Sequence, residues 1–154
     1  VAIHPISAGV ISDYDMTALM LKELLSRVTS FSLFKPRVLV TVPSSVTGVE
    51  ERNVIDAVIE AGARKVYLVE SAVATAAGAG ADLSKPDGHL VIDIGGGSLI
   101  YGFDQLVEKD TGIRTTVVDD ALSCAAFGSG KMLMNLNDMP EGMVNLARKR
   151  QMKA

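Results

Sequence analysis

Short apolar runs rich in branched residues alternate along this chain with longer segments of helical periodicity. The apolar runs cover residues 38–42, 66–69, 90–94 and 115–118. A strand that returns to the same sheet through a helix lies parallel to the strand before it, so this alternation favours parallel pairing. We therefore predict an α/β fold with a mostly parallel sheet of about four strands and helices packed on its faces.

The helical segments carry recognisable start and stop signals. Asp13 and Asp15 offer acceptors to the first turn of a helix over residues 15–29, whose apolar residues recur at spacings of three and four. The stretch 45–50 supplies a capped start for a second helix, which Gly62 ends. Further helices are predicted over 72–79, from 99 to Gly112, over 121–136 and over 139–147.

The size and composition of the chain favour one folded unit. The chain has 154 residues, of which 48% are hydrophobic and 21% charged. This apolar content is enough to offset the ordering entropy of a domain of that size, which argues against disorder. We expect residues 1–154 to form a single compact domain.

Charge and cysteine content narrow the class of protein. The net charge of -3 gives no basic field of the kind that nucleic acids attract, so we expect no nucleic-acid partner. No run approaches the roughly 18 to 20 apolar residues that span a bilayer, so we expect no membrane span and a cytoplasmic location. The single cysteine, Cys124, fits a reducing compartment, and its small apolar neighbours predict a buried packing thiol.

The most informative local motif is the sequence Asp93-Ile94-Gly95-Gly96-Gly97-Ser98, which follows the third apolar run. Gly95, Gly96 and Gly97 lack a Cβ, so backbone N–H groups can surround phosphate oxygens there, and Ser98 adds a hydroxyl. Asp93 could hold Mg²⁺ directly or through water. The alternative is a tight turn that joins a strand to a helix without binding a ligand.

Two other strand ends carry polar groups. Ser44 and Ser45 follow the first apolar run, at the sheet edge where ligands of open α/β folds usually bind. These serines could instead cap the next helix. Glu70 and Ser71 follow the second run, and the carboxylate there could position water or a metal, or be an ordinary exposed residue.

The sequence Gly128-Ser129-Gly130-Lys131 is similar to the end of a Walker A loop. The glycine that the motif requires earlier is absent, and the segment lies within a helical pattern instead of after a strand. We therefore reject a P-loop. Gly128 instead allows either close helix packing or the approach of a nucleotide.

Taken in order, these segments resemble the actin-like ATPases, and their amino-acid sequence is most similar to that of MreB proteins. The resemblance rests on residues 3–15, 37–47, 62–70, 93–97 and 104–131. It implies part of an actin-like, ribonuclease H-like ATPase domain that binds ATP and Mg²⁺ and assembles into filaments that guide cell shape. Other cytoskeletal or cell-shape proteins are further partners that it implies.

The departures from the family pattern concern its nucleotide chemistry. Nothing like the Asp-x-Gly-Thr loop of the family precedes Val1, and Ser71 followed by Ala72 stands where the family has a catalytic glutamate before a proline. The second phosphate loop and the adenine-side glycine loop, far apart in the family, are merged into 95–97. We therefore expect a truncated relative with an internal deletion, no catalytic residue, and weak or no ATPase activity.

Three interpretations follow. The chain is a shortened MreB-like cytoskeletal protein, an inactive folding or interaction module such as a designed or reconstructed half-actin, or a small Mg-ATP-binding protein that uses residues 93–97. Family members have a hairpin and a second lobe that this sequence lacks, and their loss would leave apolar surface uncovered. We therefore also expect self-association through that surface.

Overall fold

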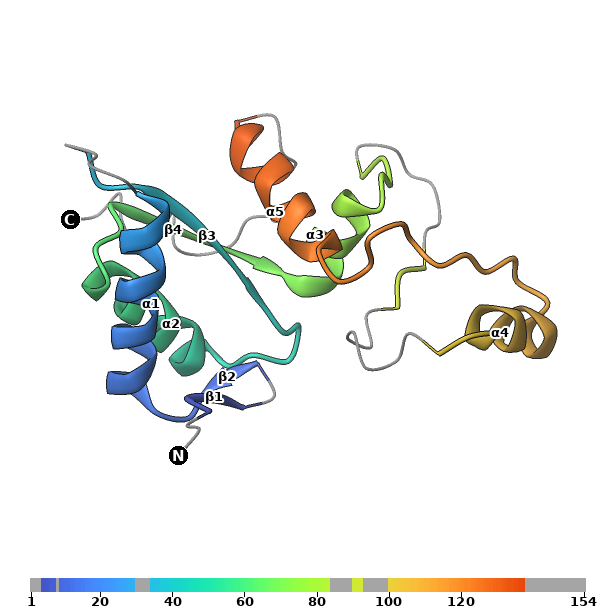
Figure 1. The fold of residues 1–154 in the computed structure, drawn as a ribbon, viewed down its shortest axis with the longest axis horizontal. Coiled ribbons are helices and arrows are strands. Elements are labelled where there is room, and N and C mark those ends of the chain that lie inside the picture. The colour runs from blue at the N-terminus through green and yellow to red at the C-terminus, as the bar shows by residue number, and fades with distance from the viewer. Residues whose placement is uncertain (1–3, 8, 30–33, 84–89, 93–99, 138–154) are drawn as a thin grey trace.

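The structure, a computed structural model, describes residues 4–7, 9–29, 34–83, 90–92 and 100–137. In Figure 1, α1 and α2 lie beside strands β3 and β4, α3 and α5 lie together beyond the strands, and α4 stands apart. The elements are β1 (Ile6–Ser7), β2 (Val10–Ile11), α1 (Tyr14–Val28), β3 (Arg37–Val42), α2 (Gly48–Glu60), β4 (Lys65–Glu70), α3 (Ser71–Gly78), α4 (Phe103–Thr111) and α5 (Cys124–Met134).

Strands β3 and β4 form a parallel pair, and α2 is the crossover between them. The register runs from Arg37 opposite Lys65 to Val42 opposite Glu70, so both strands end at the same edge. Strands β1 and β2 form a separate antiparallel hairpin. The α/β class and the parallel pairing are confirmed. The β1–β2 hairpin was not predicted from the sequence, because strands of two residues carry no periodic signal.

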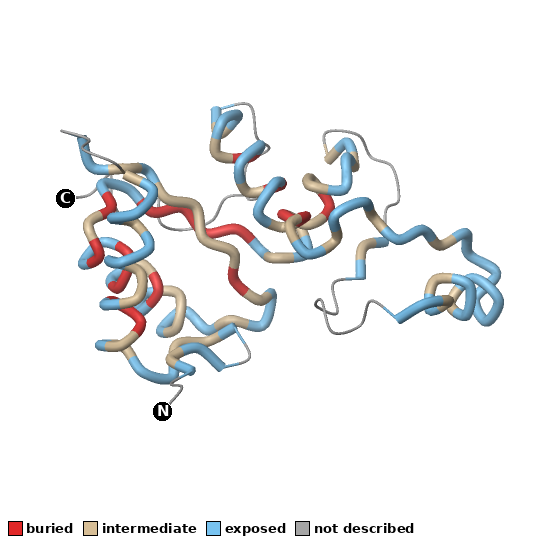
Figure 2. The backbone as a smooth tube through the Cα atoms, in the orientation of Figure 1, coloured by how far each residue is buried: buried red, intermediate tan, exposed pale blue. Residues whose placement is uncertain are grey.

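The core lies on both faces of the β3–β4 pair. On one face, Val66 and Leu68 are almost fully buried against Val58 of α2. On the other face, Val69 packs with Ala74 of α3 and Met132 of α5. Figure 2 shows the buried residues concentrated along β4 and the helices beside it. Coverage on both faces explains why β4 is continuously apolar instead of alternating, and each buried Val or Leu contributes about 1.5–3 kcal/mol.

Side-chain caps fix the starts of α1 and α2. The Met16 N–H donates to the Asp13 carboxylate at 3.0 Å. At α2, the Glu50 N–H donates to the Thr47 hydroxyl and the Thr47 N–H donates back to the Glu50 carboxylate at 2.7 Å, which completes a capping box. Both predicted helix starts are confirmed.

Helix α1 packs beside α2: Leu21 of α1 contacts the core cluster that includes Val54 and Val58 of α2, and the Tyr14 hydroxyl donates to a Glu60 carboxylate oxygen at 3.0 Å. Burial is the largest cause that raises the pKa of Tyr14, followed by the bond to Glu60. Leu24 and Val28, which belong to the apolar pattern that predicted this helix, are exposed. The buried residues of α1 are instead the small Thr17 and Ala18, and the Thr17 hydroxyl donates to the Asp13 carbonyl at 2.6 Å.

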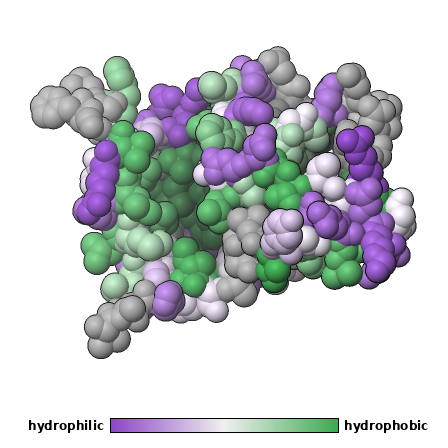
Figure 3. Space-filling view, turned by 45° about the vertical axis from the view of Figure 1, so that its right-hand side comes forward, coloured by the Kyte–Doolittle hydropathy of each residue, from purple (hydrophilic) through white to green (hydrophobic). Residues whose placement is uncertain are grey.

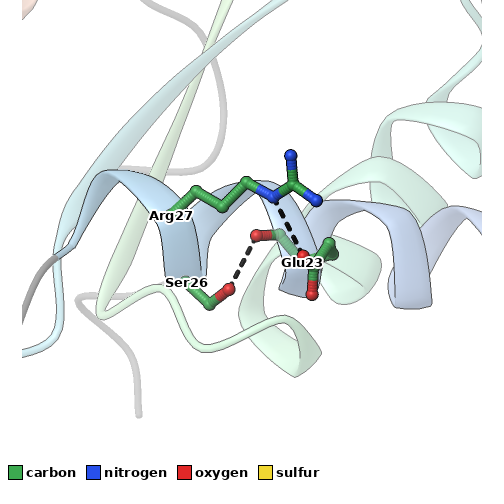
Figure 4. Close-up of polar contacts among 3 residues, drawn as sticks. All are labelled: Glu23, Ser26 and Arg27. Carbon is green, nitrogen blue, oxygen red and sulfur yellow. Dashed lines mark hydrogen bonds and ion pairs between the residues drawn. The ribbon is translucent and has the colours of Figure 1, made fainter.

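The exposed face of α1 carries a local polar cluster, drawn in Figure 4. The Arg27 Nε donates to the Glu23 carboxylate at 2.9 Å, and the Ser26 hydroxyl donates to the Glu23 carbonyl at 2.7 Å. Both charged side chains are more than half exposed, so this pair adds little to stability.

Two of the predicted strands differ from the structure. Residues 115–118 are not a strand, and the described residues 90–92 are not one either. The branched residues of 115–118 favour a strand, but strand formation depends on a neighbouring strand, and β3 and β4 are the only parallel strands among the described residues. The rest of the predicted strand 90–94 and the predicted helix 139–147 lie outside the described residues.

Helix α4 is bounded by Gly102 and Gly112, both with positive φ, and Gly112 ends it as predicted. None of its residues is buried. In Figure 2 this helix shows only exposed and intermediate residues, in contrast to β4. Local signals therefore define α4, while packing contributes little to it.

Candidate functional site

The carboxyl edge of the β3–β4 pair brings together two of the predicted polar segments. Because Val42 lies opposite Glu70, Ser44 and Ser45 leave the sheet at the same edge as Ser71. Glu70 and the two serines at 44 and 45 are exposed. The structure thus groups hydroxyls and one carboxylate at an edge where ligands of open α/β sheets bind.

The cap of α2 is Thr47, not Ser44 or Ser45, so the interpretation of these serines as helix caps is wrong. Glu50 completes that cap and is committed to it: its carboxylate accepts from both the backbone N–H and the hydroxyl of Thr47. The bond from the Thr47 backbone, and then that from its hydroxyl, lowers the pKa of Glu50. Glu50 therefore stabilises the helix start and is not available to a ligand at this edge.

Helix α3 begins directly after β4 and has no side-chain cap. Glu70 occupies the cap position without accepting from the first turn, and Ser71 is the first residue of the helix. Ser71, where the family resemblance predicts that a catalytic glutamate is replaced, thus lies at a helix start on this edge. Its side chain offers a hydroxyl and no carboxylate, and the expected absence of a catalytic residue stays a prediction.

The β1–β2 hairpin lies against the loop that follows β3. Gly9, in the turn of the hairpin, has φ +78, and a Cβ on it would lie 2.6 Å from the Pro43 Cγ. Any side chain at this position would therefore displace the loop that leads into Ser44 and Ser45. This contact was not predicted from the sequence, in which a glycine between two short apolar segments is the only local signal for the hairpin turn.

Helices α3 and α5 cross at very close range. A Cβ on Gly128 would overlap the Ala74 carbonyl oxygen, and a Cβ on Gly78 would overlap the Cys124 carbonyl oxygen. Gly128 is buried at this crossing. The close helix packing predicted for Gly128 is confirmed, and its contact with a nucleotide stays a prediction.

Polar contacts reinforce the crossing of α3 and α5. The Lys131 Nζ donates to the Ala77 carbonyl at 3.2 Å, at the end of α3, where a cation also complements the helix dipole. The Cys124 thiol, buried as predicted, donates to the Thr75 carbonyl at 3.3 Å. Lys131 is thus engaged with the backbone of α3, which agrees with the rejection of a P-loop at this segment.

The remaining predicted site residues lie outside the described residues. They are Asp93, Gly95, Gly96, Gly97 and Ser98. Their role with phosphate and Mg²⁺ therefore stays a prediction. In the part of the chain that the structure describes, no group of three or more His, Cys, Asp or Glu side chains is arranged to hold a metal ion. No helix in that part has the length and apolar character needed to cross a bilayer.

Comparison with known proteins gives matches over most of the chain. The family model described as MreB/Mbl protein matches residues 1–98 and 94–141. The chain belongs to the MreB/Mbl family. The two matches share residues 94–98, which is where the sequence predicts that two glycine loops of MreB proteins are merged.

Individual MreB and Mbl proteins match almost two thirds of the chain. The chain is 40% identical over 99 residues to the cell shape-determining protein Mbl of Bacillus subtilis, and 46% identical over 100 residues to MreB of Haemophilus influenzae. Each alignment covers 64% of this chain but only 30% and 28%, respectively, of those proteins. The chain thus spans less than a third of the length of the relatives it matches.

Solved structures support the same assignment. The chain is similar to MreB5 of Spiroplasma citri bound to ADP, with a TM-score of 0.56 and 38% identity over 62% of this chain and 28% of that one. MreB5 bound to AMPPNP gives a TM-score of 0.55 at the same identity, with 29% of that chain covered. The α/β, actin-like fold is therefore confirmed for the matched part.

Proposed function

We propose that this chain acts in determining cell shape in the cytoplasm, as a member of the MreB/Mbl family that contributes contacts to a filament. The observation that carries the proposal is the family match over residues 1–98 and 94–141, together with relatives named as cell shape-determining proteins. The close crossing of α3 and α5 supports it, since a rigid unit is what a filament contact requires.

The filament contact has a direct test in sedimentation velocity of the full chain at rising concentration, with and without Mg-ATP. We expect reversible association that strengthens with concentration, because large apolar side chains such as Leu19, Leu24 and Val28 are exposed on α1. On the face that Figure 3 draws, apolar side chains adjoin one another over part of the surface, between polar ones. A strict monomer under all conditions would contradict the proposal.

The same proposal includes a weak nucleotide site. Two solved MreB5 structures of the family hold ADP and AMPPNP. In this chain, the glycines at 95–97 would surround phosphate, Asp93 would hold Mg²⁺, and Ser98 would add a hydroxyl. The hydroxyls of Ser44, Ser45 and Ser71 at the carboxyl edge are groups of the kind that bind phosphate, and this edge supports the proposal. With Ser71 in place of a catalytic glutamate, binding without turnover is expected.

Calorimetric titration of the full chain with Mg-ATP tests the nucleotide site. We expect weak, saturable heat in the wild type and its loss in Asp93→Ala. Asp56→Ala, an exposed aspartate on α2, is the matched control and should bind like the wild type. Binding that survives Asp93→Ala would contradict the assigned site. A chain that assembles without any binding heat would favour the second interpretation, an interaction module without nucleotide.

A further inference from the structure

Helix α4 presents an apolar face that nothing in the described structure covers. Phe103 is 40% exposed and Leu106 is 52% exposed, although both belong to the apolar side of the helix. Beside them, a shallow hollow of about 420 Å³ is lined by residues that include Ile100, Tyr101 and Val117. Exposed apolar surface next to a hollow is typical of a place where another segment binds.

Acidic residues outnumber basic ones on this part of the chain. Asp104 lines the hollow itself, Glu108 and Asp110 lie on α4, and Asp119 and Asp120 follow α4 in the sequence. The stretch 100–123 contains only two basic residues, Lys109 and Arg114, so it carries net negative charge. The charge of a second copy of α4 would oppose an α4-to-α4 contact, and it favours a basic, partly apolar ligand instead.

The chain itself supplies such a ligand. Residues 139–154 contain four basic residues and one acidic residue, Glu141. The basic residues are Arg148, Lys149, Arg150 and Lys153. Met139, Met143 and Leu146 add apolar side chains at spacings of four and three, which match the spacing needed to meet an apolar helix face. Charge and hydropathy of this segment thus complement those around α4.

We infer that the α4 face, with the hollow beside it, is the binding site for the basic C-terminal segment 139–154. Apolar side chains of the segment meet Phe103 and Leu106, and its basic side chains meet the carboxylates around them. The contact depends on both terms, because exposed ion pairs alone are worth little. It is therefore sensitive to salt without being abolished by loss of a single charge.

Nuclear magnetic resonance of the full, isotope-labelled chain tests this inference. The variant Arg148→Glu/Lys149→Glu/Arg150→Glu should shift the amide signals of residues 103–111, which are distant in sequence from the substitutions. Raising the salt from about 0.01 M to about 1 M shortens the Debye length from about 30 Å to about 3 Å and should move the same signals in the wild type.

The matched control reverses three exposed basic residues elsewhere, in Lys22→Glu/Arg52→Glu/Arg64→Glu. This control should leave the signals of residues 103–111 in place. Signals of α4 that respond neither to the tail variant nor to salt would overturn the inference, and the salt series in the wild type stays informative if a variant fails to fold. A dilution series identifies whether the segment comes from the same chain or a second copy, and either source fulfils the proposal.

Discussion

Strand β4 buries four consecutive residues, Val66 to Val69, whereas helix α4 buries none of its nine. The strand is covered by α2 on one face and by α3 with α5 on the other. The helix has clear bounds at Gly102 and Gly112 but no such cover. Local signals are thus enough to define where an element begins and ends, while its contribution to stability depends on partners from distant parts of the chain.

The largest difference between β4 and α4 should appear in the free energy of unfolding when a leucine is replaced by alanine in each of them. Leu68 is 1% exposed, and Leu68→Ala should lower the free energy of unfolding by about 2–5 kcal/mol through lost burial and a residual cavity. Leu106→Ala on α4 is the matched control and should change it by less than about 0.5 kcal/mol. Denaturant titration measures both. Equal losses would mean that α4 is as well packed as the core.

The α3–α5 crossing should respond to one added methyl group. Gly128→Ala places a Cβ against the Ala74 carbonyl, which is backbone and moves only with the helix, so a loss of about 1–3 kcal/mol is expected. In the same helix, Gly130 has open space around its Cβ position, and Gly130→Ala should gain up to about 1 kcal/mol from helix propensity. Denaturant titration of the pair distinguishes packing from propensity. A neutral Gly128→Ala would refute the close crossing.

The capping box of α2 should matter less than either packing change. Thr47→Ala should cost about 1 kcal/mol, because the Glu50 N–H loses its side-chain acceptor. The matched change Thr116→Ala, at an exposed position after α4, should be close to neutral. Thermal or denaturant unfolding of both variants makes the comparison. Equal effects would show that the segment after α4 is more ordered than its exposure indicates.

The same cap predicts a dependence on pH. Because the folded state lowers the pKa of Glu50, the stabilisation is present above the usual pKa of glutamate and is lost as the pH falls through the lowered value. Thr47→Ala should reduce this acid-side loss in part, because it removes the bond from the Thr47 hydroxyl, while the bond from the backbone N–H of residue 47, which lowers the pKa of Glu50 most, remains. Unfolding curves at a series of acidic pH values measure it, and identical slopes in the two proteins would contradict the assignment.

The smallest effect is expected at the Glu23–Arg27 pair on the exposed face of α1. Glu23→Gln should change the free energy of unfolding by less than about 0.5 kcal/mol, because both side chains are solvated. Denaturant titration at low and high salt is the measurement. A loss comparable to that of Leu68→Ala would mean that this face of α1 is covered, which would shift the boundary between the packed and unpacked regions.

The sequence predicted elements that carry their own signals. The cap at Asp13, the Thr47–Glu50 pair and the closing Gly112 are local, and each helix bound they imply is found within one or two residues. The prediction of a strand at 115–118 was wrong, because branched residues favour a strand only where a neighbouring strand is present to pair with it. The β1–β2 hairpin was missed for the opposite reason: its strands are too short to carry a pattern, and tertiary contact through Gly9 holds it.

The candidate site was only partly within reach of the sequence. Grouping Ser44 and Ser45 with Glu70 follows from parallel pairing, which apolar runs predict. The commitment of Glu50 to the helix cap follows from the capping-box spacing of Thr47 and Glu50, whereas the bond from Lys131 to the Ala77 carbonyl depends on tertiary geometry that no motif expresses. Gly128 shows the ambiguity best, since the same residue type serves close helix packing and close approach of a ligand.

The direct contact between α3 and α5 brings Gly78 and Cys124 together, although a long stretch of sequence separates them. The chain between these two residues is a long connection whose two ends are in contact with each other. Lengthening such a connection has a small entropic cost, about 0.6 kcal/mol for each doubling of its length. The anchored ends would therefore tolerate insertions of very different size, and a whole added lobe could be accommodated there without disturbing the sheet that precedes it.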